Sequence, residues 1–130
     1  MEKLEDLYDA MNINSDKDIL KSLDPDEKIF LSTLVSKFNY KGKKQERIFI
    51  LTNKYVYNVA SPSLFNDIFS KVTSFGRIRR KIPIEKISAI SMSKLSSEFV
   101  IHVPSEYDYR YSSFDKFGLN IIFLIYIDGI

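Results

Sequence analysis

The chain has 130 residues, of which 45% are hydrophobic and 28% charged, as expected for one soluble domain with its own core. It contains no cysteine, which excludes disulfides, thiolate metal sites and a cysteine nucleophile. Residues 1–28 hold nine acidic against four basic residues, a net charge of −5, whereas residues 29–130 hold fifteen basic against eight acidic, a net charge of +7. A basic body favours a polyanionic partner, the alternative being a solvated surface of mixed charge.

Residues 1–25 form an acidic leader in which we expect short helices. Its first apolar residues recur at helical spacing and predict an amphipathic helix: Leu4, Leu7, Tyr8 and Met11. Residues 14–16 supply N-cap side chains for a second helix through Ile19 and Leu23. Pro25 holds the preceding residue in extended geometry, so the domain proper is predicted over residues 26–130. We expect the acidic leader to lie on the body and to screen part of its basic face.

Two short apolar runs and a basic connector then predict a β-hairpin. The runs, residues 29–35 and 48–51, are rich in Ile, Leu, Phe and Val. The connector, residues 37–47, has one acid and five cations: Lys37, Lys41, Lys43, Lys44 and Arg47. Gly42 can adopt a positive φ at the turn. A third strand is expected at residues 55–59, which makes an antiparallel meander with its most charged loop at one end.

Later patterns predict four more strands and two helices. The strands are expected at residues 77–84, 86–93, 98–103 and 107–111. A helical face predicts a short helical insertion over residues 61–72, and a Ser-Ser corner predicts a C-terminal helix over residues 114–130. The sequence therefore predicts a mainly β (α+β) fold, an antiparallel barrel or sandwich of about seven strands with a C-terminal helix.

No constellation of catalytic side chains is apparent in the sequence. The single histidine, His102, falls within an alternating strand and is interpreted as an ordinary strand histidine. The four glycines are scattered and do not form a phosphate-binding loop. We therefore expect no enzymatic activity, ATP hydrolysis included, and neither a cofactor nor a metal.

Three segments in combination resemble the tail homology 1 domain of class I myosins, which is itself similar to the pleckstrin homology fold. They are residues 45–57, 79–93 and 99–104, and the resemblance covers about residues 26–113. It implies a pleckstrin homology-like module that binds anionic phospholipids, phosphoinositides especially. It also implies that Lys37 and Arg47 grip the headgroup, with the three other connector lysines between them.

Other residues leave alternatives open. A second basic cluster either flanks the same lipid surface or is a solvated strand face: Arg77, Arg79, Arg80 and Lys81. Phe38 and Tyr40 either lie at the level of the lipid headgroups, where aromatic rings are favoured, or pack against the barrel mouth. A tyrosine stripe is interpreted as packing rather than as a platform for nucleic-acid bases: Tyr107, Tyr109 and Tyr111.

The sequence thus predicts a monomeric, cytoplasmic module that lies on the membrane surface. Each Lys or Arg near an anionic membrane contributes about 1 kcal/mol, so the five connector cations support reversible, salt-sensitive recruitment. A cytoskeletal or other protein partner is also expected. The alternatives are a protein-interaction module without a lipid ligand and, as the weakest, a nucleic-acid-binding β-barrel. The acidic N-terminus lacks the pattern of a secretory signal.

Overall fold

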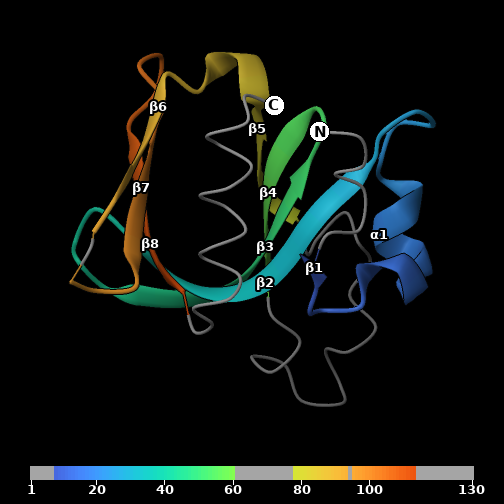
Figure 1. Cartoon of the computed structure of the whole chain (residues 1–130), viewed down its shortest axis with the longest axis horizontal. Coiled ribbons are helices and arrows are strands. Elements are labelled where there is room, and N and C mark those ends of the chain that lie inside the picture. The colour runs from blue at the N-terminus through green and yellow to red at the C-terminus, as the bar shows by residue number, and fades with distance from the viewer. Residues whose placement is uncertain (1–7, 61–77, 94, 114–130) are drawn as a thin grey trace.

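The computed structural model describes residues 8–60, 78–93 and 95–113 (Figure 1). Both helices expected at residues 61–72 and 114–130 lie outside this part of the chain. The described elements are β1 (Tyr8–Asp9), η1 (Ile13–Ser15), α1 (Lys17–Lys21), β2 (Ile29–Phe38), β3 (Lys44–Thr52), β4 (Tyr55–Ala60), β5 (Ile78–Pro83), η3 (Ile84–Lys86), β6 (Ala89–Met92), β7 (Glu98–His102) and β8 (Asp108–Ser113).

The seven strands predicted from the sequence are all present, and they form one antiparallel sheet. Their order is β5-β4-β3-β2-β8-β7-β6, and β1 pairs in parallel with β2 outside this order. The long strand β2 joins the two meanders, because it pairs with β3 on one side and with β8 on the other. The sheet curves so that β6, β7 and β8 stand opposite β4 and β5 (Figure 1). The fold is therefore mainly β, and its described part is an open, sandwich-like sheet.

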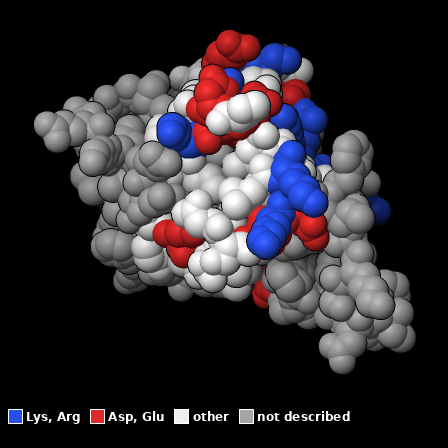
Figure 2. Space-filling model, turned by 90° about the vertical axis from the view of Figure 1, so that its right-hand side faces the viewer, with Lys and Arg blue, Asp and Glu red and all other residues white. Residues whose placement is uncertain are grey.

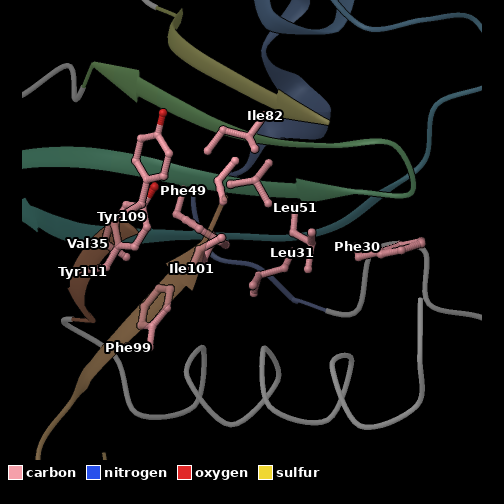
Figure 3. Packing of buried hydrophobic residues seen from close by; sticks show 12 residues of the cluster. Phe30, Leu31, Val35, Phe49, Leu51, Ile82, Phe99, Ile101, Tyr109 and Tyr111 are labelled. Carbon is pink, nitrogen blue, oxygen red and sulfur yellow. The ribbon is translucent and has the colours of Figure 1, made fainter. Parts of the chain in front are cut away.

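The larger core lies on the inner face of this curved sheet (Figure 3). The ring of Phe49 on β3 meets Phe99 and Tyr111 edge-on, with centroids 5.6 and 5.3 Å apart. Phe99 and Tyr111 stack on each other at 5.0 Å. Aromatic pairs of this kind add about 0.5–1.5 kcal/mol each beyond the area that they bury. The cluster therefore holds the β7–β8 arm of the sheet against β3.

The leader packs on the outer face of the sheet. Ile13 and Ile19 are each only 1% exposed and join a second cluster with Ile48 and Ile50 of β3. The Asp16 side chain caps α1 by accepting a hydrogen bond from the Ile19 N–H at 3.1 Å, which confirms the predicted cap. Residues 13–19 are thus part of the folded unit.

The predicted first helix is wrong where it can be compared, because Tyr8 and Asp9 form strand β1. The Asp9 carboxylate accepts the hydroxyl of Ser32 at 2.5 Å and the N–H of Ile13 at 2.8 Å. The bond from the Ile13 N–H and the pairing with β2 engage backbone groups that would otherwise form hydrogen bonds within a helix. Tertiary contacts therefore override the local helical spacing.

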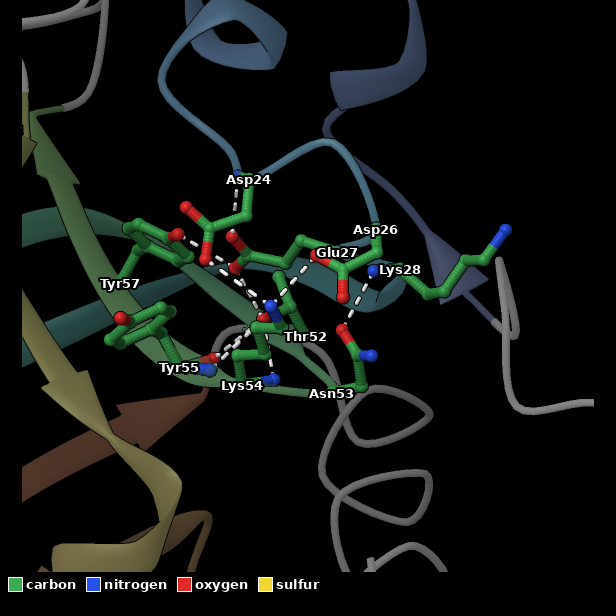
Figure 4. A network of polar contacts seen from close by, with 9 residues as sticks. All are labelled: Asp24, Asp26, Glu27, Lys28, Thr52, Asn53, Lys54, Tyr55 and Tyr57. Carbon is green, nitrogen blue, oxygen red and sulfur yellow. Dashed lines mark hydrogen bonds and ion pairs between the residues drawn. The ribbon is translucent and has the colours of Figure 1, made fainter.

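A buried carboxylate fastens the leader to the β3–β4 turn (Figure 4). Glu27 accepts hydrogen bonds from the hydroxyls of Thr52 and Tyr57, both at 2.6 Å, and from the N–H of Asp24 at 3.0 Å. Burial, followed by the bond to Glu27, raises the pKa of Tyr57, so the phenol remains a protonated donor. The network therefore fixes the entry of the chain into β2.

The leader lies on the body, as expected, but its Asp24 and the adjacent Asp26 are engaged away from the predicted basic loop. Lys54 pairs with Asp26 at 2.7 Å and with Asp24 at 3.4 Å, at the end of the hairpin that carries the β3–β4 turn. This contact raises the pKa of Lys54 and lowers that of Asp26. Figure 2 shows acidic and basic side chains side by side on the side of the molecule that carries α1.

Replacing Ile19 tests whether the leader belongs to the folded unit. We expect Ile19→Ala to lower the free energy of unfolding by about 2–5 kcal/mol, because it leaves a cavity in the outer cluster. The exposed neighbour variant Lys17→Ala should stay within about 0.5 kcal/mol of the parent. Urea unfolding measures both. A loss for Ile19→Ala no larger than that of the control would show that the leader is not part of the cooperative unit.

Candidate anion-binding site

The hairpin that carries the predicted site has a shorter loop than the sequence suggested. β2 continues to Phe38 and β3 starts at Lys44, so the β2–β3 loop comprises only residues 39–43. Of the five connector cations, Lys37, Lys44 and Arg47 are strand residues. The other two, Lys41 and Lys43, lie in the loop. The apolar pattern ends before Lys37, but the backbone ladder continues through polar residues to the turn.

Asn39 holds this loop in a defined shape. Its side-chain oxygen accepts the N–H groups of Lys41 and Lys43, both at 2.9 Å. Gly42 has a φ of 80°, in the left-handed region that favours glycine, and donates its N–H to the Asn39 carbonyl at 2.9 Å. The turn therefore presents the loop lysines on a fixed backbone.

Lys37 and Arg47 lie on the same face of the sheet. Lys37 pairs with Gln45, and Arg47 pairs with Val35, whose side chain belongs to the inner core. Directly paired residues share a face of the sheet, so Arg47 lies on the inner face with Val35. Side chains alternate along a strand, so Lys37, two residues after Val35, lies on that face as well. As diagonal neighbours, their backbones lie about 7 Å apart. The Lys37 ammonium is 5.7 Å from the centre of the Tyr109 ring.

Arg47 and Arg79 form a pair of like charges. Burial, followed by the positive charge of Arg79, lowers the pKa of Arg47 from its ordinary value. Arg47 donates a hydrogen bond to the Glu46 carbonyl at 2.8 Å, and within residues 8–60, 78–93 and 95–113 neither arginine has an acidic partner. Arg79 sits at an irregularity between β4 and β5, where a bulge can redirect a side chain. An anion would relieve this repulsion.

The second basic cluster predicted from sequence is divided between the two faces of β5. Arg80 forms an ion pair with Glu106 and donates a hydrogen bond to the Tyr109 hydroxyl at 2.7 Å. Lys81 lies on the outer face, with its ammonium 4.1 Å from the centre of the Tyr55 ring. Arg77 lies outside the described residues. Of this cluster, Arg79 lies near Arg47, and Arg80 reaches Tyr109, the ring over which Lys37 packs.

A groove of about 620 Å³ opens between the β2–β3 loop and the β7–β8 loop (residues 103–107). It is lined by Lys37, Phe38, Asn39, Tyr40, Gly42, Tyr107, Asp108 and Arg110. Of the inner-face cations only Lys37 is among the residues that line the groove, whose walls are otherwise polar and aromatic.

Arg110 is a basic residue of this site that the sequence did not reveal. Its guanidinium lies 4.0 Å from the centre of the Phe38 ring and pairs with Glu98 at 2.7 Å. Lys44 approaches the same ring at 5.5 Å, so Phe38 packs between two cations. The alternating pattern of β8 was visible in the sequence, but its pairing with β2, which places Arg110 opposite Phe38, is not a local signal.

His102 ties three strands together on the outer face of the sheet. Its Nε2 lies 2.6 Å from the Ser91 hydroxyl, and its Nδ1 lies 3.0 Å from the Asp108 carboxylate. The order of these groups resembles a serine-histidine-aspartate triad, which also requires oxyanion donors and a substrate cleft. The groove that Asp108 lines includes neither Ser91 nor His102. We therefore interpret the contact as a cross-strand tie. Within the described ranges no cluster of potential metal ligands occurs.

Comparison with known proteins assigns the chain to a family. Residues 7–122 match the family described as "Unconventional myosin tail, actin- and lipid-binding", and the chain belongs to this family. The chain is also 35% identical over 85 residues to the myosin IA heavy chain of Dictyostelium discoideum. The match covers 65% of this chain and 8% of that protein, so the chain corresponds to a small part of its relative. The resemblance predicted from sequence is thus confirmed.

Glu106 is expected to stabilise the domain without taking part in anion binding. The hydrogen bond from Arg80, followed by that from Tyr109, lowers the pKa of Glu106 below its ordinary 4.5. A lowered pKa contributes stability above pH 4.5 that disappears as the pH falls through the folded-state value. Glu106→Gln should therefore lower the free energy of unfolding by about 1 kcal/mol at neutral pH and have a smaller effect in acid. Urea unfolding over a pH series measures this, and a cost that does not depend on pH would contradict the assignment.

Proposed function

We propose that this chain is a non-catalytic membrane-binding module that recognises anionic phospholipids, with phosphoinositides as the preferred headgroups. The observation that carries the proposal is the placement of Lys37 and Arg47 on one face of paired strands, with Arg79 beside them. For none of these three does the part of the chain that the structure describes supply an acidic partner. A cluster of cations that the described residues do not neutralise, held on a sheet, is suited to a ligand with several phosphates.

The two cations on the strands and the two in the loop have different roles. Lys37 and Arg47 are fixed by the register of β2 and β3, so they can make directional, charge-assisted bonds to phosphate oxygens. Lys41 and Lys43 are exposed in the loop and supply a less specific attraction of about 1 kcal/mol each. Lys44 lies on the outer face beside Phe38 and adds to the potential around the hairpin.

The finer structural class and the setting belong to this proposal. The strand order supports a pleckstrin homology-like fold over residues 26–130. We infer that the module works as a cytoplasmic monomer at the membrane surface and does not bind nucleic acid. No helix within the described ranges is both long and apolar enough to cross a bilayer.

A protein partner is a second candidate, because the description of the family names actin beside lipid. On the outer face a hollow of about 400 Å³ is lined by two lysines, Lys21 and Lys81, together with Ser22, Tyr57 and Ile78. This surface lies on the face opposite to Lys37 and Arg47 and suits an acidic protein surface. Lipid and protein could therefore bind on different faces.

Removal of the charge at the two strand positions tests the proposed headgroup site. On phosphoinositide vesicles, Lys37→Ala and Arg47→Ala should each weaken binding more than tenfold, because each removes a directional contact as well as a charge. Lys43→Ala, the matched loop variant, should weaken binding only about fivefold. Sedimentation with vesicles measures the affinities, and circular dichroism checks that each variant is folded.

The same series on phosphatidylserine vesicles of equal charge is the control for specificity. There we expect the three variants to differ much less, because no polyphosphate headgroup engages the strand cations. Equal losses of affinity for all three variants on both lipids would mean that binding depends on charge density alone. The headgroup site would then have to be abandoned.

A further inference from the structure

Exposed aromatic side chains gather at the hairpin end of the molecule. Three large hydrophobic residues of the described ranges are exposed: Tyr40 (92%), Tyr107 (58%) and Leu95 (98%). Tyr40 and Tyr107 come from loops 67 positions apart in the numbering, yet both line the groove beside Lys37. Leu95 lies in the β6–β7 turn, beyond the end of β7 that is remote from the hairpin loop.

Both rings are held in place by defined contacts. Tyr40 sits in the loop that Asn39 and Gly42 shape, and the Lys41 ammonium lies 5.6 Å from the centre of its ring. The Tyr107 ring lies 4.5 Å from that of Tyr109, whose hydroxyl donates a hydrogen bond to Glu106 at 2.6 Å. The two tyrosines therefore project from ordered loops, so little conformational entropy is lost when a partner covers them.

We propose that Tyr40 and Tyr107 enter the headgroup layer of the membrane together, so that the bilayer itself, and not the charged headgroup alone, is the ligand. The inference rests on the proposed lipid-binding function, which supplies the attraction to the surface. Tyrosine is favoured at this depth because its ring leaves water while its hydroxyl stays among polar groups. The loop lysines at the same end would then meet the lipid phosphates.

This geometry also orients the domain. The Glu27 and Lys54 network lies at the opposite end of the β2–β3 hairpin, about 30 Å away along a nine-residue strand. With the tyrosines in the headgroup layer, Asp24 and Asp26 are held away from the anionic surface. Since the Debye length is about 8 Å at physiological ionic strength, their repulsion by the membrane is screened at that distance.

Tryptophan fluorescence gives a direct test, because the chain contains no tryptophan of its own. Three variants of the 130-residue chain each introduce one probe: Tyr40→Trp, Tyr107→Trp and the matched control Leu95→Trp. They are mixed with vesicles of phosphatidylcholine and a phosphoinositide, with or without brominated acyl chains. We expect a blue shift and bromine quenching for the first two probes and neither change for the third.

The outcomes separate this inference from the proposed function. If vesicles sediment the protein but the probes at positions 40 and 107 are no better quenched than that at 95, the inference is wrong and lipid binding stands. If vesicles fail to sediment the parent protein, both are wrong.

Serine variants give an independent measurement. The double variant Tyr40→Ser/Tyr107→Ser should bind vesicles about tenfold more weakly with an unchanged salt dependence, since it removes no charge. Leu95→Ser, the matched control outside the groove, should bind vesicles as the parent does. Parent-like vesicle binding by the double variant would overturn the inference.

Discussion

The pairing register of β2 is the constraint on which the fold and the site both depend. This strand pairs with β1, β3 and β8, and its core residues Leu31 and Val35 are fully buried. Because strand side chains alternate, a slip of one residue would turn Leu31 and Val35 outward and move Lys37 to the outer face. The apolar residues that stabilise the domain therefore also decide where the hairpin cations point.

The second arm of the sheet completes the site by bringing distant residues to the hairpin. The aromatic cluster of Phe49, Phe99 and Tyr111 holds β7 and β8 against β3. At the rim, Arg80 and Glu106 link β5 to the β7–β8 loop. These contacts place the groove next to Lys37, so the site depends on packing between segments far apart in the sequence as much as on the hairpin itself.

The strands were predictable from the sequence, because apolar alternation is a local signal. The N-cap at Asp16 was also readable, since capping involves neighbouring residues. The strand at Tyr8 and Asp9 was not, because its partner is 23 positions away and the apolar spacing in that region favours a helix. The hairpin loop was overestimated because polar residues near the turn carry no apolar pattern, although the backbone ladder continues through them.

Of the candidate site, the sequence supplied the hairpin cations but not their neighbours. Arg80 and Lys81 are consecutive residues of β5, so their side chains lie on opposite faces of the sheet. The predicted strand alone was sufficient to expect this. The approach of Arg79 to Arg47 depends on a local irregularity of β5, and the position of Arg110 depends on the pairing of β8 with β2. Both are tertiary features that a pattern in one segment does not encode.

The central claim is that a rigid pair of strands holds cations for one polyphosphate headgroup. The most direct measurement is a titration of the ¹⁵N-labelled protein with a soluble inositol polyphosphate, followed by the amide chemical shifts. The account predicts saturable shifts that centre on Lys37, Arg47 and Arg79 and share one dissociation constant. Shifts confined to Lys41 and Lys43, without saturation, would contradict it.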